Sequence, residues 1–232
     1  HPDKEIVFVG VGFETTTPLV AMAIKRAQAL GLKNFSVFVA HKNMPNALEV
    51  IVSDPELKID ALILPGHVST IIGTKPYEFL AEKYGIPGVI TGFEPVDVLQ
   101  GIAMIMRQLH EGRAEIEIAY SRGVMREGNP VALAAIDEVF DTVDATWRGL
   151  GVIPGSGYAI REEFEDFDAV KRFHPEVEPT QNPKGCRCGD VLRGIMAPDE
   201  CPLFRKVCTP ENPVGPCMVS SEGSCAAYYR YY

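Results

Sequence analysis

The sequence has 232 residues, of which 46% are hydrophobic and 23% are charged, so it can bury a core and is not typical of a disordered chain. Its 31 acidic residues outnumber its 22 basic residues, and the formal net charge of -9 disfavours nucleic acid and anionic membrane surfaces as partners. No apolar run approaches the roughly 20 residues that a transmembrane helix requires.

The part of the sequence before residue 150 alternates short β-branched runs with segments of helical periodicity. The predicted strands are residues 5–11, 35–40, 61–64, 87–91 and 116–120, and the predicted helices are residues 18–30, 46–52, 77–84 and 95–110. This alternation is typical of βαβ units and predicts an α/β fold with a doubly wound parallel sheet. Ligands of such sheets bind beyond the carboxyl ends of the strands.

The alternation of strands and helices ends towards the C-terminus, where a separate small domain is expected. We predict a helix over residues 130–142, a glycine-rich extended stretch over 147–160 and an acidic surface helix over 162–173. Pro175, Pro179 and Pro183 indicate a linker over residues 174–184. The predicted domains are therefore residues 1–180, an α/β part, and residues 181–232, a small cysteine-rich domain.

Polar residues follow the first predicted strand. Glu14, Thr15, Thr16 and Thr17 lie in the loop, and Pro18 suits the first turn of a helix. One interpretation is a helix N-cap, in which a threonine hydroxyl accepts from first-turn N–H groups and the acid lies near the positive end of the helix. A cap needs one threonine and not three, so a ligand-binding role for these groups is the other interpretation. Both can hold together.

Similar residues are expected in the loops after later strands. These candidates are His67, Ser69, Thr70, Glu94 and His41. A histidine after a Pro-Gly turn at the carboxyl end of a strand favours a residue of a binding cleft, but not a metal ligand. Glu94 has an alternative interpretation as an acid at the start of a helix.

The glycines do not form a nucleotide-binding motif. Gly10 and Gly12 follow the first strand, but the third glycine of G-x-G-x-x-G is missing, and no G-x-x-x-x-G-K-[ST] occurs. The stretch Gly155-Ser156-Gly157 lacks the G-x-S-x-G spacing of a nucleophile elbow. Neither nucleotide binding nor hydrolase chemistry is favoured.

All six cysteines lie between Cys186 and Cys225, and the sequence before them has none. Three disulfides would be typical of a secreted domain, but the cysteine-free α/β part is typical of an intracellular protein, so we expect a cytoplasmic location. Structural zinc usually takes pairs of ligands a few residues apart, and here only Cys186 and Cys188 lie close. A four-thiolate iron–sulfur cluster tolerates wide spacing. Spacing alone does not decide among disulfides, zinc and an iron–sulfur cluster.

Several long motifs occur in the order that a known family shows. They are GFETTTP (12–18), LPGHVSTIIG (64–73), TGFEP (91–95) and GCRCGDVLRGIMAPDECPLFRKVCTPENPVGPCMVSSEGSCAAYYRY (185–231). The sequence resembles the HypD family of [NiFe]-hydrogenase maturation proteins over essentially its whole length.

The resemblance implies roles for all six cysteines. The family holds a [4Fe-4S] cluster with four cysteines, which correspond here to Cys186, Cys201, Cys208 and Cys225. The remaining pair, Cys188 and Cys217, corresponds to cysteines thought to form a redox-active disulfide beside the cluster. A cluster supplies electrons one at a time, and a neighbouring disulfide stores two as a dithiol.

The resemblance also implies an activity and partners. Members of the family assemble, with HypC and HypE, the Fe(CN)2CO unit of the hydrogenase, and the nascent iron is expected in a cleft between two α/β lobes. By this resemblance, residues 1–180 would form a wall of the cleft and residues 181–232 would be the [4Fe-4S] cluster domain. The groups from Glu14 to Thr17 would then hydrogen-bond cyanide nitrogens. The protein is expected to be an accessory assembly protein with redox-active thiols and not a conventional turnover enzyme.

One departure from the family concerns the iron. The family's iron-binding cysteine lies in a Cys-Gly-Thr-His stretch, and a Cys-Pro-Val-Cys pair also lies upstream, but neither occurs in this sequence. We therefore expect the natural start to be missing and, with it, the primary iron thiolate. Two alternatives stay open: an iron–sulfur thiol-disulfide oxidoreductase that acts without HypC or HypE, and a zinc-stapled α/β binding domain.

Overall fold

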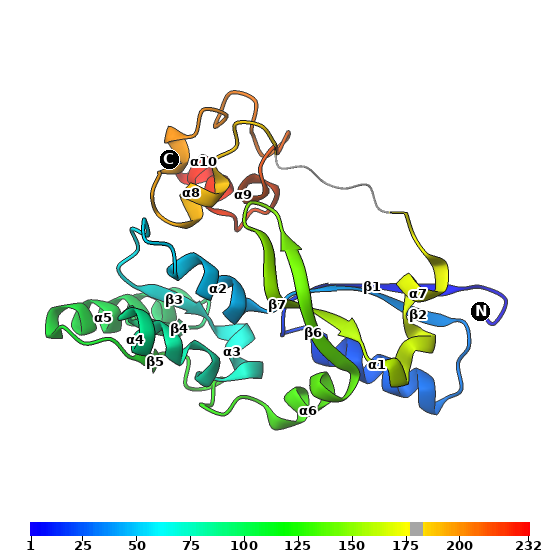
Figure 1. The fold of residues 1–232 in the computed structure, drawn as a ribbon. Coiled ribbons are helices and arrows are strands. Elements are labelled where there is room, and N and C mark those ends of the chain that lie inside the picture. The colour runs from blue at the N-terminus through cyan, green and yellow to red at the C-terminus, as the bar shows by residue number, and fades with distance from the viewer. Residues whose placement is uncertain (177–182) are drawn as a thin grey trace. The chain divides into compact units, whose positions relative to one another are not determined.

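The computed structural model describes residues 1–176 and 183–232 and divides into two compact units (Figure 1). The first unit contains residues 1–48, 60–145 and 154–176. The second contains residues 49–59, 146–153 and the described residues from 183 onward. The predicted domain boundary at residue 180 lies outside the described residues, as does part of the predicted linker.

The first unit begins with a two-stranded parallel sheet. β1 (Ile6–Gly12) pairs with β2 (Phe35–His41), and α1 (Thr17–Ala29) connects them. These elements confirm the predicted strands and helix to within one residue at each end. Every third or fourth residue of α1 is buried, as the spacing of its apolar residues predicts.

A three-stranded parallel sheet follows, in the order β3-β4-β5. The strands are β3 (Leu62–Pro65), β4 (Gly88–Thr91) and β5 (Ile116–Ile118); the crossovers contain α3 (Gly66–Ile72), η1 (Lys75–Tyr77), α4 (Glu78–Tyr84) and α5 (Pro95–Glu111). The prediction of one doubly wound sheet is wrong, because β2 does not pair with β3 in the described part of the chain. The chain leaves the first unit within α2 (Met44–Val52): residues 49–59 belong to the second unit, and the chain then returns to build a separate sheet.

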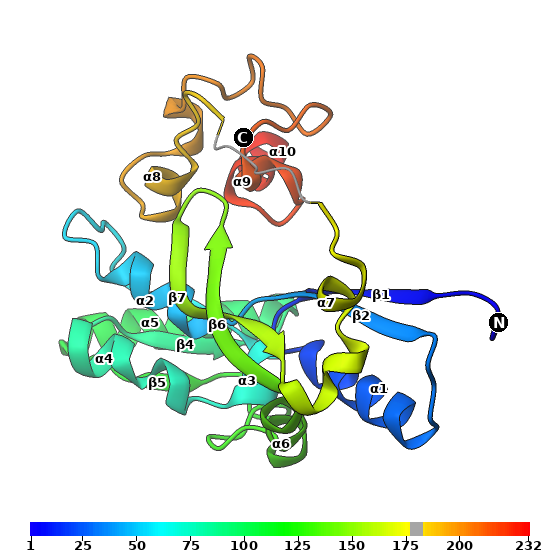
Figure 2. The same ribbon diagram turned by 45° about the vertical axis from the view of Figure 1, so that its right-hand side comes forward.

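A hairpin follows the second sheet. α6 (Pro130–Val139) begins at Asn129, whose side chain accepts from the N–H groups of Val131 and Ala132 at 3.1 Å. The helix predicted to residue 142 ends earlier, because the alternating run from Phe140 forms β6 (Phe140–Trp147) and pairs with β7 (Gly151–Ile160). Figure 2 shows this hairpin in yellow-green.

The helix predicted over residues 162–173 is two helices. η2 (Glu162–Phe167) ends before Asp168, whose backbone is extended, and α7 (Ala169–Phe173) follows. The Asp168 carboxylate accepts from the N–H groups of Val170 and Lys171 at 2.8 and 3.3 Å. Aspartate thus caps a new helix where continuous periodicity had suggested a single one.

The core of the first unit lies around α1 and α6, which pack side by side. Its buried members include Ile24 on α1, Val37 on β2 and Val139 at the end of α6, all completely inaccessible to solvent. Among the described residues, no helix has both the length and the apolar character that crossing a membrane demands.

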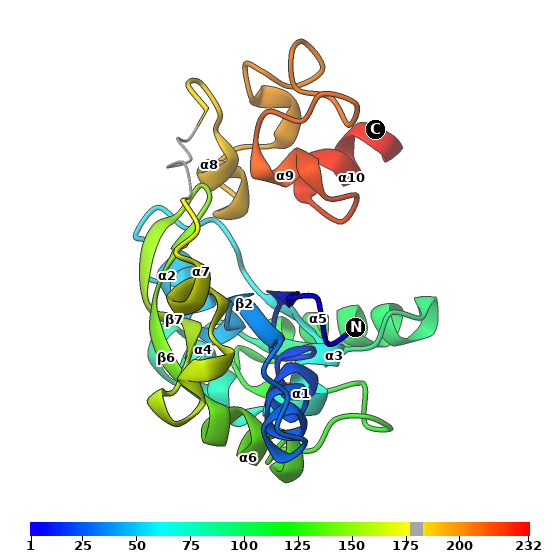
Figure 3. The same ribbon diagram turned by 90° about the vertical axis from the view of Figure 1, so that its right-hand side faces the viewer.

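The second unit has short helices joined by long loops, as Figure 3 shows. They are α8 (Cys188–Leu192), η3 (Pro198–Glu200), α9 (Pro216–Val219) and α10 (Ser224–Tyr231). Its buried cluster consists largely of cysteines, together with Phe204, Met218 and Ala226. The predicted cysteine-rich region is therefore a packed unit in which sulfur atoms form much of the interior.

Replacing Ile24 with alanine tests the core of the first unit. Ile24→Ala removes a completely buried side chain and is expected to lower the free energy of unfolding by about 2–5 kcal/mol. Leu19→Ala is the matched control, because Leu19 lies on the same helix with 69% of its surface exposed, and its cost should stay below about 0.5 kcal/mol. Urea denaturation measures both, and equal losses would contradict this description of the core.

Candidate functional site

All six cysteines of the second unit line a single narrow cavity. They come from separate places: Cys186 precedes α8, Cys188 begins it, Cys201 follows η3, Cys208 lies in a loop, Cys217 is on α9 and Cys225 is on α10. Apolar side chains of Val191, Leu203 and Met218 complete the lining. The fold thus brings together sulfur atoms that are widely spaced in the sequence.

The six cysteines divide into a bonded pair and four thiols. Cys188 and Cys217 form a disulfide across 29 residues of sequence. Cys186, Cys201, Cys208 and Cys225 are free, and all but Cys186 are buried. This is the division that the family resemblance implied. A redox role for the disulfide and a ligand role for the thiols remain predictions.

The surroundings of the four thiols favour a cationic group between them. Burial, together with the smaller effect of the neighbouring thiols Cys201, Cys208 and Cys186, raises the pKa of Cys225 to about 11. Burial also raises the pKa of Cys186. Because thiolates crowd one another, they need compensating positive charge, which a metal group supplies as it displaces their protons.

Backbone geometry also prepares the cavity for sulfur ligands. The N–H of Val214 donates to the Cys208 sulfur at 3.4 Å. Hydrogen bonds of this kind change the reduction potential of iron–sulfur clusters. A Cβ atom at Gly215 would lie 2.4 Å from the Cys186 sulfur, so a larger residue there would displace this sulfur. By its chemistry, the set of four thiols fits a [4Fe-4S] cluster, in which each iron takes one thiolate and the four sulfurs do not converge on a single ion. Among the described side chains, no group of three or more His, Cys, Asp and Glu is spaced to hold a metal ion.

The threonines after β1 serve the backbone. Thr16 occupies the N-cap position of α1, but its side chain makes no capping bond. Instead, the hydroxyls of Thr16 and Thr17 donate to the carbonyl of Phe13 at 3.3 and 2.9 Å. The hydroxyl-cap interpretation is therefore wrong, because these side chains tighten the turn before the helix. Thr17 is buried, Thr15 is partly buried and Thr16 is exposed.

The Glu14 side chain bonds to the start of α2, although the residue itself precedes α1 in the chain. One carboxylate oxygen accepts from the N–H of Met44 at 3.0 Å, and the other has no hydrogen-bond partner among the described residues. Burial raises the pKa of Glu14 to about 6, against a smaller opposing effect of backbone hydrogen bonds. The carboxylate also interacts electrostatically with the buried Tyr77. Glu14 is thus a buried acid whose pKa lies well above that of an exposed glutamate.

His67, Ser69 and Thr70 lie on α3, and their predicted placement in a loop is wrong. The helix begins directly after Pro65, where the hydroxyl of Ser69 donates to the Pro65 carbonyl at 2.8 Å. Thr70 likewise donates to the His67 carbonyl at 2.7 Å. Ser69 is completely buried, whereas His67 is exposed. Of these three, only the histidine offers its polar atoms openly at the strand end.

The carboxyl ends of β3 and β4 bring His67 and Glu94 to one edge. The His67 ring packs on Phe93, with the centroids 4.6 Å apart, and Glu94 follows in the chain as the exposed N-cap residue of α5. Arg122 pairs with Glu94 at 3.4 Å and makes two hydrogen bonds to the buried Asp97, at 2.7 and 2.6 Å. The sequence reasoning missed Asp97 and Arg122, although an arginine after a strand end was the available signal.

His41 is buried at the end of β2. Neither of its ring nitrogens has a hydrogen-bond partner among the described residues, and burial lowers the pKa of His41. A Cβ atom at Gly10 would lie 2.7 Å from the ring, so glycine makes room for the histidine. The position of the His41 ring against β1 thus gives Gly10 a packing role, and no nucleotide is needed to account for this glycine.

Comparisons with known proteins support one family. The matching family model is HypD, described as the hydrogenase formation hypA family, and it covers residues 1–232. The hydrogenase maturation factor HypD of Cupriavidus necator is 49% identical over all of this chain and 63% of its own length. The hydrogenase expression/formation protein HupD of Azotobacter chroococcum is 50% identical over all of this chain and 62% of its own length. The chain thus spans less than two thirds of these relatives.

Glu14 gives a pH-dependent prediction. Its pKa rises from 4.5 to about 6 on folding, so the stability it contributes is complete below the lower value and is lost as the pH passes the higher one. Relative to the wild type, Glu14→Gln should therefore gain about 2 kcal/mol of unfolding free energy between about pH 4 and about pH 7. Denaturant unfolding at both pH values measures this gain.

The control for Glu14→Gln is Glu82→Gln, which removes a carboxylate at an exposed position of α4. Because this side chain is exposed in the folded as well as the unfolded chain, the control should not reproduce the gain expected for Glu14→Gln. A constant difference for Glu14→Gln would mean that burial does not raise the pKa of this acid.

Proposed function

Because this chain belongs to the HypD hydrogenase formation family, we propose that it acts in [NiFe]-hydrogenase maturation as a scaffold and redox relay. The observation that carries the proposal is the single cavity lined by four free thiols and one disulfide. Four thiolates suit a [4Fe-4S] cluster, and a disulfide beside them suits the storage of two electrons.

The proposed ligands are Cys186, Cys201, Cys208 and Cys225. A bound [4Fe-4S] cluster supplies electrons one at a time. The four cysteines hold it as thiolates, Val214 donates to one of their sulfurs and Gly215 leaves space for another. The apolar lining from Leu203, Phe204 and Met218 keeps water away from the sulfurs, which affects the potential of such a site.

The relay step concerns Cys188 and Cys217. Two electrons and two protons convert their disulfide into two thiols, and the electrons come from an external one-electron donor protein. The two thiols then pass both electrons on by thiol–disulfide exchange, in which a thiolate attacks a disulfide and the pair is oxidised again. The reaction thus balances without any permanent change in the protein.

The scaffold function concerns the first unit. We propose that it contributes one wall of the cleft in which the Fe(CN)2CO unit is assembled with HypC and HypE. The groups that offer polar atoms at strand ends, above all His67 and Glu94, are its ligand-binding candidates, with Thr15 and Thr16 at the end of β1. In this proposal iron is a substrate, and none of the six cysteines of the second unit is its ligand.

A thiol-disulfide oxidoreductase is the second candidate, and the Cys188–Cys217 disulfide favours it. Such a protein would reduce the disulfide of a thioredoxin-like substrate in the absence of HypC and HypE. The scaffold proposal expects no such turnover with the chain alone. An assay of insulin or thioredoxin reduction by the reduced protein separates the two functions.

Metal analysis tests the cluster. After anaerobic purification and reconstitution with iron and sulfide, the protein should hold iron and sulfide in equal amounts and absorb in the visible range. Colourless protein with stoichiometric zinc would instead support the zinc-stapled binding domain.

Paired cysteine variants test the division of the six sulfurs. Cys201→Ala should abolish iron and sulfide binding, because it removes a ligand. Cys188→Ala should retain the cluster and lose only the ability to take up two electrons as thiols, as counted by alkylation and mass spectrometry. If both variants lose the cluster to the same extent, the division is wrong.

A further inference from the structure

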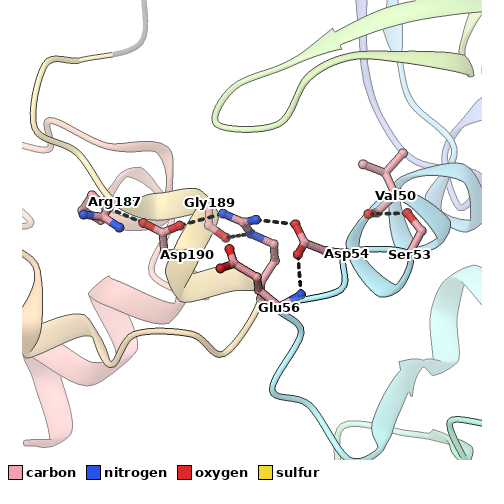
Figure 4. Close-up of polar contacts among 8 residues, drawn as sticks. Val50, Ser53, Asp54, Glu56, Arg187, Gly189 and Asp190 are labelled. Atoms are coloured by element: carbon pink, nitrogen blue, oxygen red, sulfur yellow. Dashed lines mark hydrogen bonds and ion pairs between the residues drawn. The ribbon is translucent and has the colours of Figure 1, made fainter.

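A polar network in the second unit surrounds the start of α8, the helix that begins at Cys188. Figure 4 shows Asp54, Asp190 and Arg187 joined in a row, with Gly189 beside them. The residue that connects the row is Arg193, one position after the helix ends. Nothing in the proposed relay uses this arginine.

The guanidinium of Arg193 donates in three directions. Its Nε donates to the Gly189 carbonyl at 3.1 Å, one Nη donates to Asp190 at 2.6 Å, and the other Nη donates to Asp54. Arg187 donates to the second oxygen of Asp190. Side chains of Arg193, Asp54 and Asp190 are at most 24% exposed, so these ion pairs are less screened by water than pairs on the open surface.

Asp54 is itself fixed. One of its oxygens accepts from the N–H of Glu56 at 2.8 Å, in the turn that follows α2. The backbone adds a second attachment, because the N–H of Lys58 donates to the Arg193 carbonyl at 3.1 Å. A Cβ atom at Gly194 would lie 2.8 Å from the Lys58 carbonyl oxygen, so glycine permits this close approach. The segment 54–58 therefore provides a rigid support.

α8 needs such a support. It has five residues, and a helix of little more than one turn is unstable by itself. The two acceptors that Arg193 holds within α8, Gly189 and Asp190, are the residues directly after Cys188. Fixing them fixes the backbone from which the Cys188 sulfur reaches Cys217.

We propose that Arg193 is a positioning residue for the Cys188–Cys217 pair: by tying α8 to the turn at Asp54, it keeps the two sulfurs within bonding reach. This inference rests on the proposed redox relay. Formation of a disulfide within a chain becomes more favourable as the fold holds the two thiols closer together. Loss of the support makes the disulfide easier to reduce.

The test measures the disulfide equilibrium in the anaerobically purified chain. Protein is equilibrated with mixtures of reduced and oxidised dithiothreitol, and the thiols of Cys188 and Cys217 are counted by alkylation and mass spectrometry. Arg193→Gln is expected to lower the equilibrium constant for disulfide formation at least tenfold, which raises the reduction potential by about 30 mV. An unchanged constant would overturn the proposal.

Four further variants separate positioning from other effects. Arg193→Lys keeps the charge but cannot donate in three fixed directions, so it should not restore the wild-type constant; full restoration would mean that charge alone matters. Asp54→Asn should shift the constant in the same direction by less, and the double variant Asp54→Asn with Arg193→Gln should be no worse than Arg193→Gln alone. Arg230→Gln, an equal change at an exposed position of α10, should have no effect.

The outcomes distinguish this inference from the proposed function. If the wild-type disulfide cannot be reduced and reformed reversibly, both fall. If the wild-type disulfide is reversible and Arg193→Gln matches it, only the role of Arg193 falls. Far-UV circular dichroism shows whether Arg193→Gln folds; if it does not, Asp54→Asn decides, since an unchanged constant overturns the proposal and a lowered one supports it.

Discussion

The second unit depends on its cysteines, through the disulfide between Cys188 and Cys217 and through the packing of the other buried sulfur atoms. Its helices have eight residues or fewer, and cysteines make up most of its buried cluster. A unit of about 70 residues buries too little apolar surface to be secure without covalent or metal links. The cysteines are therefore needed for the stability of the unit, whatever chemistry they perform. The proposed redox chemistry uses the same sulfur atoms.

The first unit is built differently, and its polar residues follow from that. Apolar side chains of α1, α6 and β2 give it an ordinary core. The stability from this core can offset the cost of buried polar groups at the strand ends. Glu14, His41 and Tyr77 all have buried polar atoms without hydrogen-bond partners among the described residues. Such groups cost stability when nothing pairs with them. Glu14 and His41 lie where β1 and β2 end, so this edge of the first sheet is a stronger candidate for ligand chemistry than its threonines alone.

The sequence predicted local structure well and long-range pairing poorly. Strands and helices from Ile6 to Ile118 were found because hydrophobic periodicity is a local property. The single doubly wound sheet was wrong, since the departure of residues 49–59 into the other unit leaves no local trace. The helix over α3 was missed because Gly66 and His67 resemble a loop, although Ser69 bonds back to Pro65. The division of the cysteines came from the family resemblance, because spacing left three chemistries open, and Arg193 was invisible because its partner Asp54 lies 139 positions away.

The redox relay places a physical demand on the second unit. A disulfide that closes a loop of 29 residues stabilises a fold by about 3–4 kcal/mol in the chain-entropy model. A relay opens that bond in every cycle, so the unit must hold its shape during the reduced phase through other contacts. The four remaining thiols can supply part of this through a bound cluster, and the fork of Arg193 on Gly189, Asp190 and Asp54 supplies contacts that do not depend on sulfur. A support of that kind is what allows the same two thiols to meet again and close the bond.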